Sequence, residues 1–106
     1  LEGEACEPIE AEAEIEIFVA NDCTMQVVPP SYDVARGRTA RFTYVNRSRD
    51  YPVDVWLSYG GGFLDLPTGE SWPDRFVHCA GPRRPRQAGA DISTACSEHR
   101  FVINCL

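Results

Sequence analysis

Short β-rich segments separated by turn residues run along most of this 106-residue chain and limit the folds that it can adopt. Alternating apolar and polar residues predict strands at 15–20, 23–28, 39–45, 52–59, 63–66, 71–79, 90–96 and 100–105. Loops are expected at 29–38 and 80–89, where proline, glycine and arginine gather. Because no helical segment separates these strands, the sequence predicts an all-β fold, an antiparallel β-sandwich of about seven strands.

The length and the charge distribution predict one domain behind an acidic leader. Residues 1–16 contain seven glutamates and no base, whereas residues 17–106 contain nine acids and ten arginines. We therefore expect residues 1–14 to be a largely unstructured leader and residues 15–106 to form the sandwich. This charge balance disfavours nucleic acid as a partner, and no apolar run is long enough to span a membrane.

Five cysteines in so short a chain predict disulfides and an oxidising compartment, either secreted or periplasmic. We expect bridges among Cys23, Cys79, Cys96 and Cys105, with Cys6 left over, and spacing alone leaves the pairing open. The acidic first residues do not form a signal peptide, so an exported chain of this kind is expected in its mature form. All ten basic residues are arginine, a bias typical of GC-rich genomes that favours a bacterial origin.

Two histidines next to cysteines raise an alternative, a small cupredoxin-like protein that binds copper or zinc. His78 and Cys79 would have to meet Cys96 and His99, which requires the strands around 76–79 and 96–99 to be neighbours. These pairs lack the usual Cys-x2-Cys spacing of zinc sites, and the only methionine, Met25, is distant in sequence. The competing interpretation is a Cys79–Cys96 disulfide with two surface histidines, and we favour it, so no cofactor is expected.

One part of the chain contains four short motifs in succession: Asn-Arg-Ser at 46–48, Val-Trp-Leu at 55–57, Gly61 and Leu-Pro-Thr-Gly at 66–69. Together these motifs resemble the core hairpin of the von Hippel–Lindau tumour suppressor β-domain. They follow in the family's order and cover about residues 39–69. The resemblance implies a prealbumin-like β-sandwich with a peptide-recognition face on which Trp56 matches the family's tryptophan. The family's helical domain has no counterpart here, so ligase-adaptor function is not implied.

Trp56 is the residue that decides where a binding surface would lie. Alternation in 52–59 places it opposite Val53, Val55 and Leu57. Because only one face of each sheet in a sandwich is core, either Trp56 is core and the valines lie outside, or Trp56 marks a binding surface.

No Gly-x-Ser-x-Gly nucleophile motif is present, so we expect a non-catalytic interaction module rather than an enzyme. The expected protein or peptide partner would contact an aromatic face, with the arginine-rich loop at 82–86 as a second contact. The module itself is expected to be a monomer or a weak oligomer. The predicted contact residues are Trp56, Tyr59, Phe63, Arg83, Arg84 and Arg86.

Overall fold

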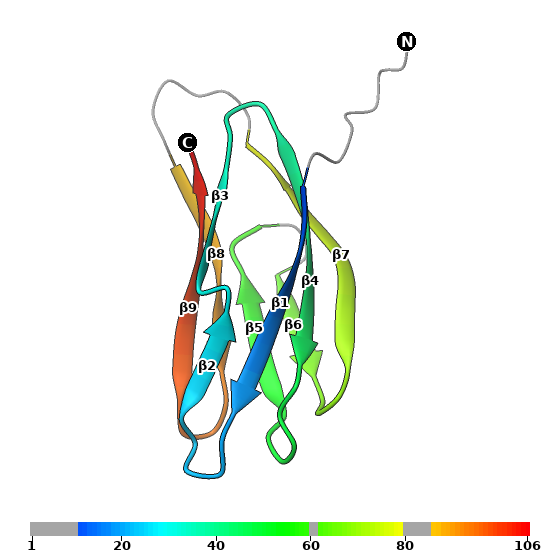
Figure 1. Cartoon of the computed structure of the whole chain (residues 1–106), viewed down its shortest axis with the longest axis vertical. Helices are drawn as coiled ribbons and strands as arrows, with labels where there is room; N and C mark the ends of the chain where they lie inside the picture. The colour runs from blue at the N-terminus through cyan, green and yellow to red at the C-terminus, as the bar shows by residue number, and fades with distance from the viewer. Residues whose placement is uncertain (1–10, 60–61, 80–85) are drawn as a thin grey trace.

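The computed structural model of the chain consists of two β-sheets that face each other (Figure 1). It describes residues 11–59, 62–79 and 86–106. The four-stranded sheet contains, in order, β2 (Met25–Val28), β1 (Ala11–Val19), β4 (Thr39–Asn46) and β7 (Ser71–His78). The five-stranded sheet contains β3 (Ser31–Val34), β9 (Glu98–Cys105), β8 (Arg86–Ser93), β5 (Val53–Leu57) and β6 (Phe63–Leu66). The predicted all-β sandwich is confirmed.

Most strand pairings in the described residues are antiparallel, but two are parallel. β1 pairs with β4 in parallel, with Ile15 opposite Tyr44, and β3 pairs with β9 in parallel, with Tyr32 opposite Ile103. Parallel neighbours need crossover connections, and both pairs are joined by chain that passes through the other sheet. The sheets are therefore mixed, which the succession of strands along the sequence did not indicate.

The core lies between the sheets and is formed by the alternate residues that each strand turns inward. Phe42 and Tyr44 of β4 meet Phe101 of β9 edge-on, with ring centroids 5.9 Å and 6.2 Å from that of Phe101. Alternation in β1 buries Ile15 and Ile17 and leaves the glutamates between them on the outer face, as the sequence predicts. The other fully buried large side chains include Leu64, Leu66, Ile92, Ile103, Val53 and Val55.

The largest differences from the predicted elements concern three strands. β1 begins at Ala11, so residues 11–14 of the expected leader belong to a strand, while residues 1–10 lie outside the described part of the chain. β3 lies within the loop predicted at 29–38, and β8 begins at Arg86 within the loop predicted at 80–89. In both cases the paired neighbour is β9, which supplies hydrogen bonds that the local sequence pattern does not reveal.

Two disulfides join the sheets, one at each end of the sandwich. Cys79, which follows β7, is bonded to Cys105 at the end of β9. Cys23, in the turn between β1 and β2, is bonded to Cys96, in the turn between β8 and β9. The bridges use the four cysteines named from the sequence, but the Cys79–Cys96 pairing considered there is wrong, because these two cysteines lie at opposite ends of the fold.

The edge strand β6 is linked to the opposite sheet by an indole. β6 pairs only with β5. Trp72 of β7 donates its Nε1 hydrogen to the main-chain carbonyl oxygen of Asp65, at 3.3 Å. This bond connects the two sheets along the side where β6 and β7 form their respective edges.

Within the described residues, no helix that could cross a membrane is present.

We expect Gly89→Ala to destabilise the sandwich. Gly89 is buried in β8, and a Cβ built on it would overlap the carbonyl oxygen of Phe101 in β9. Since the overlapping group is main chain in a paired strand, the strand must shift, and overpacking of this kind costs about 1–3 kcal/mol. Chemical denaturation followed by circular dichroism measures the change. An unaltered free energy of unfolding would show that β8 and β9 separate here without penalty.

Candidate functional site

An exposed aromatic pair lies on the outer face of the five-stranded sheet. Val53 and Val55 of β5 are buried in the core, whereas Trp56 is 57% exposed. Phe63 of β6 is directly opposite Trp56 in the strand register and is 43% exposed, with ring centroids 4.5 Å apart. Of the two arrangements open for Trp56, the structure has the one in which the valines are inside and the tryptophan is outside.

Tyr59 does not belong to this outer face. Its ring packs edge-on against Phe42, with centroids 6.5 Å apart, and its hydroxyl is hydrogen-bonded to the hydroxyl of Tyr44. Burial, together with the neighbouring Tyr59, raises the pKa of Tyr44 well above its usual range, so the Tyr44 hydroxyl stays protonated. Tyr59 therefore does not share the outer face with Trp56, because its ring lies on the inner side with Val53 and Val55. Its predicted contact role stays a prediction.

Carboxylates surround the aromatic pair. Asp54 and Asp65 are directly opposite each other on β5 and β6, in the register position next to Trp56 and Phe63. Asp91 of β8 is opposite Trp56 on its other side and accepts a hydrogen bond from Arg100 Nη1 at 3.1 Å. These outer positions follow from the period of two along each strand. The aromatic surface thus has acidic flanks on both sides.

Of the three arginines predicted as a second contact, only Arg86 lies among the described residues. Arg83 and Arg84 lie outside the described residues. Arg86 is the first residue of β8, and its backbone is opposite Cys105 in the register with β9. The predicted role of these three arginines as a second contact stays a prediction.

The four side chains proposed for a metal site are not brought together. β7 and β9 belong to different sheets, and both cysteines of the set are bonded to other cysteines. His78 is next to Cys79, whose partner Cys105 ends β9, whereas His99 lies near the start of β9. Six residues of strand separate His99 from Cys105, which is about 20 Å at the usual rise. The two histidines therefore lie at opposite ends of the sandwich.

The individual environments of the histidines agree with this separation. The Nδ1 atom of His78 is hydrogen-bonded to the hydroxyl of Thr39 on the paired strand, at 2.8 Å. The Nε2 atom of His99 is buried without a hydrogen-bond partner among the described residues. In that same part of the chain, no three His, Cys, Asp or Glu side chains gather where they could hold a metal ion. These residues do not fit a blue-copper site, which needs two histidines and a cysteine thiolate together.

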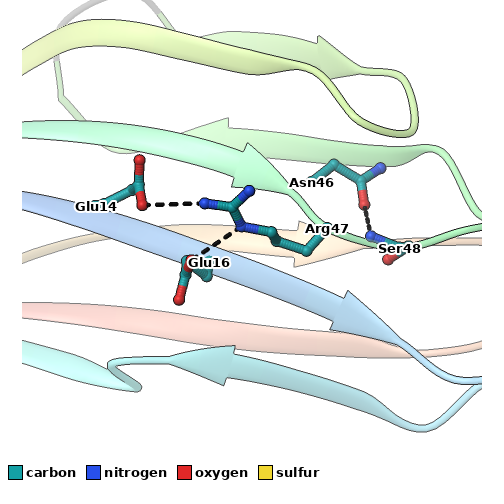
Figure 2. A network of polar contacts seen from close by, with 5 residues as sticks. All are labelled: Glu14, Glu16, Asn46, Arg47 and Ser48. Carbon is teal, nitrogen blue, oxygen red and sulfur yellow. Dashed lines mark hydrogen bonds and ion pairs between the residues drawn. The ribbon is translucent and has the colours of Figure 1, made fainter.

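The Asn-Arg-Ser turn at 46–48 is a structural junction (Figure 2). The Asn46 side chain is fully buried, and its Nδ2 donates to the carbonyl oxygens of Tyr51 and Leu66 at 2.8 Å and 3.0 Å. Its Oδ1 accepts from the Ser48 amide at 2.9 Å, and Ser48 Oγ accepts from the Val19 amide at 2.8 Å. Asn-Arg-Ser also fits the Asn-x-Ser pattern of an N-glycosylation acceptor. In the folded protein this acceptor is closed to a glycan, because the Asn46 amide nitrogen is enclosed and has two partners.

Arg47, between these two residues, faces the outer side of the four-stranded sheet. Its Nε and Nη2 form ion pairs with Glu16 and Glu14 of β1 at 2.9 Å and 3.3 Å (Figure 2). Its main-chain amide donates to the carbonyl oxygen of Ile17. The three side chains of this tripeptide thus fasten one turn to β1, to β6 and to the loop that precedes β5.

Comparison with known proteins finds similarity in fold alone. No protein-family model matches the chain, and no curated protein matches its sequence. The multicopper oxidase Fet3p, which functions in iron import, has a solved structure that superposes with a TM-score of 0.62 at 8% identity, covering 91% of this chain and 28% of that one. The McoA multicopper oxidase of the hyperthermophile Aquifex aeolicus gives 0.54 at 9% identity, covering 99% and 31%.

A third similar structure, a heme-copper terminal oxidase dimer, gives a TM-score of 0.52 at 8% identity and covers 88% of this chain and 64% of that chain. The chain thus spans less than a third of either multicopper oxidase and under two thirds of the terminal oxidase chain. These similarities favour the cupredoxin-like alternative over the interaction-module prediction as far as architecture is concerned. The chain has a cupredoxin-like β-sandwich fold.

Proposed function

We propose that the chain is a non-catalytic recognition domain on a cupredoxin-like scaffold, and that it binds a protein or peptide partner through the Trp56–Phe63 pair. The observation that carries the proposal is the exposure of this tilted aromatic pair on the outer face of a sheet whose inner face packs in the core. Tryptophan is among the residues that contribute most at protein interfaces, and exposed aromatic clusters are uncommon on surfaces without a partner.

Two further considerations support this function. Trp56 is the position that matches the recognition tryptophan in the von Hippel–Lindau-like segment, and it lies on the surface. Both disulfides join the two sheets, so they suit a domain that works in an oxidising compartment outside the cytoplasm. The four described cysteines are bonded in pairs, so none of them offers a free thiol nucleophile.

Site-specific photo-crosslinking in the organism of origin tests this function. With benzoylphenylalanine at position 56, we expect a discrete crosslinked product, because the partner covers that ring. The matched control places the same group at Phe18, which is 38% exposed on the outer face of the four-stranded sheet. Products that are equal at both positions, or absent at position 56, would overturn the proposed face.

Metal binding is the second candidate, and the likeness in fold to copper oxidases is the observation that favours it. We expect no stoichiometric copper site, because the predicted ligands lie in two different sheets and at opposite ends. Titration of the non-reduced protein with Cu²⁺, followed by calorimetry and visible absorption, measures this. A one-to-one site that His78→Gln and His99→Gln both abolish would make copper binding the better function.

A further inference from the structure

The outer face around Trp56 has a charge that its own arginines do not balance. On β5, β6, β8 and β9, in the positions whose side chains the structure describes, the outward charged residues are Asp54, Asp65, Asp91, Glu98 and Arg100. Arg100 is committed to Asp91. Neither Asp54 nor Asp65 forms an ion pair with any described side chain. Two carboxylates therefore flank the aromatic pair without a counter-charge from the side chains that the structure describes.

The register makes this arrangement unfavourable in the free protein. Asp54 and Asp65 are directly opposite each other on adjacent antiparallel strands. Like charges in that position repel and destabilise the sheet. A cation placed between them would relieve the repulsion, and nearby Arg100 is held by Asp91 instead.

The exposed tryptophan on this face also favours a positively charged ligand. Trp56 is more than half exposed, and the ring of Phe63 packs against it at a tilt. The negative face of an indole attracts a guanidinium or ammonium group, and tryptophan does so more strongly than other side chains. An anionic membrane or a nucleic acid would be repelled by the adjacent carboxylates.

From this juxtaposition we infer that the partner presents a basic segment to the Trp56 face, with an arginine or lysine cation stacked on Trp56 and paired with Asp54 and Asp65. The inference rests on the proposed function and specifies its partner class. A guanidinium suits the site because it stacks on a ring and pairs with carboxylates at the same time. The occupant is a segment of another protein, and a second copy of this chain is an outcome of the test.

The test uses the full chain and a fluorescent synthetic peptide of alternating arginine and glycine, with its citrulline counterpart as an uncharged match. We expect fluorescence anisotropy to report binding of the arginine peptide only. Binding should weaken as the salt concentration rises from about 0.01 M to about 0.15 M, because the Debye length shortens. Trp56→Leu keeps an apolar side chain but removes the ring, and should raise Kd roughly five- to thirty-fold.

Two charge variants separate a local site from overall net charge. Asp54→Asn with Asp65→Asn should raise Kd about five-fold, since each exposed ion pair contributes modestly. The matched control, Glu12→Gln with Glu14→Gln, makes the same change of net charge on the other sheet and should leave Kd unchanged. An equal loss in both double variants, or equal binding of the citrulline peptide, would overturn the inference.

The remaining outcomes are also decisive. Crosslinking at position 56 together with failure to bind the arginine peptide would reject the basic partner and leave the recognition function standing. Absence of both would reject the two together. Self-association that depends on Trp56, seen by sedimentation without peptide, would show that the face is covered by a second copy and would overturn the inference.

Discussion

Asn46→Ala should lower the free energy of unfolding by about 4 kcal/mol, because two buried main-chain groups and one part-buried group lose their partner. Each stranded buried group costs about 1–3 kcal/mol. These groups are the carbonyl oxygens of Tyr51 and Leu66 and the amide of Ser48. The side chain is fully buried, so water cannot replace it without opening the turn. Urea unfolding under non-reducing conditions, followed by far-ultraviolet circular dichroism, measures the loss.

Two further variants show whether the lost hydrogen bonds of Asn46 cause the loss of stability. Asn46→Asp keeps the acceptor for Ser48 but turns a carboxylate oxygen toward two carbonyl oxygens, so it should be as damaging as alanine above the aspartate pKa. Asn21→Ala changes an asparagine that is exposed in the turn after β1, and it should have little effect. If Asn46→Ala were as stable as Asn21→Ala, the junction would have no role in stability.

Removal of the Cys23–Cys96 bridge, by Cys23→Ser with Cys96→Ser, should cost about 4 kcal/mol, since the bridge closes a long loop whose freedom returns to the unfolded chain. The two residues are 73 positions apart, whereas Cys79 and Cys105 are 26 apart. The bridge also holds the β1–β2 turn against the β8–β9 turn in the other sheet. Differential scanning calorimetry of the variant measures the shift in Tm.

Removal of the Cys79–Cys105 bridge should lower the stability for two reasons rather than one. Cys79 and Cys105 are buried in the core, so Cys79→Ala with Cys105→Ala removes packing as well as a shorter loop closure, which alone is worth about 3.5 kcal/mol. A Tm for the Cys23–Cys96 variant that equals the Tm of the parent protein would show that the sheets hold together at that end without the bridge.

Local patterns predicted the elements that alternate strongly and missed the ones that depend on a neighbour. β1 and β4 read clearly because Ile15, Ile17, Phe42 and Tyr44 recur at every second position. β3 has four residues and only one of them, Val34, is buried, so its identity as a strand depends on pairing with β9. The parallel pairings were missed for the same reason: the order of strands in a sheet is decided by packing between distant segments.

The candidate site was predicted in part. Alternation in β5 showed that Trp56 and the valines face opposite sides, but the choice of side needed the second sheet, which covers Val53 and Val55. Tyr59 was grouped with Trp56 because both are aromatic and close in sequence, although the period of two places position 59 on the same side as Val53 and Val55. The pairing of cysteines depended on which turns meet at each end of the sandwich, and spacing along the chain contains no such information.

The indole of Trp72 has a consequence for association between molecules. A bare edge strand presents unpaired carbonyls to which a strand of another molecule can add, and such addition leads to fibres. Because the Trp72 ring lies against the Asp65 carbonyl of β6, one acceptor on that edge is already occupied and the ring obstructs an approaching chain. A tryptophan that at first sight adds an exposed apolar group thus protects the protein against uncontrolled polymerisation.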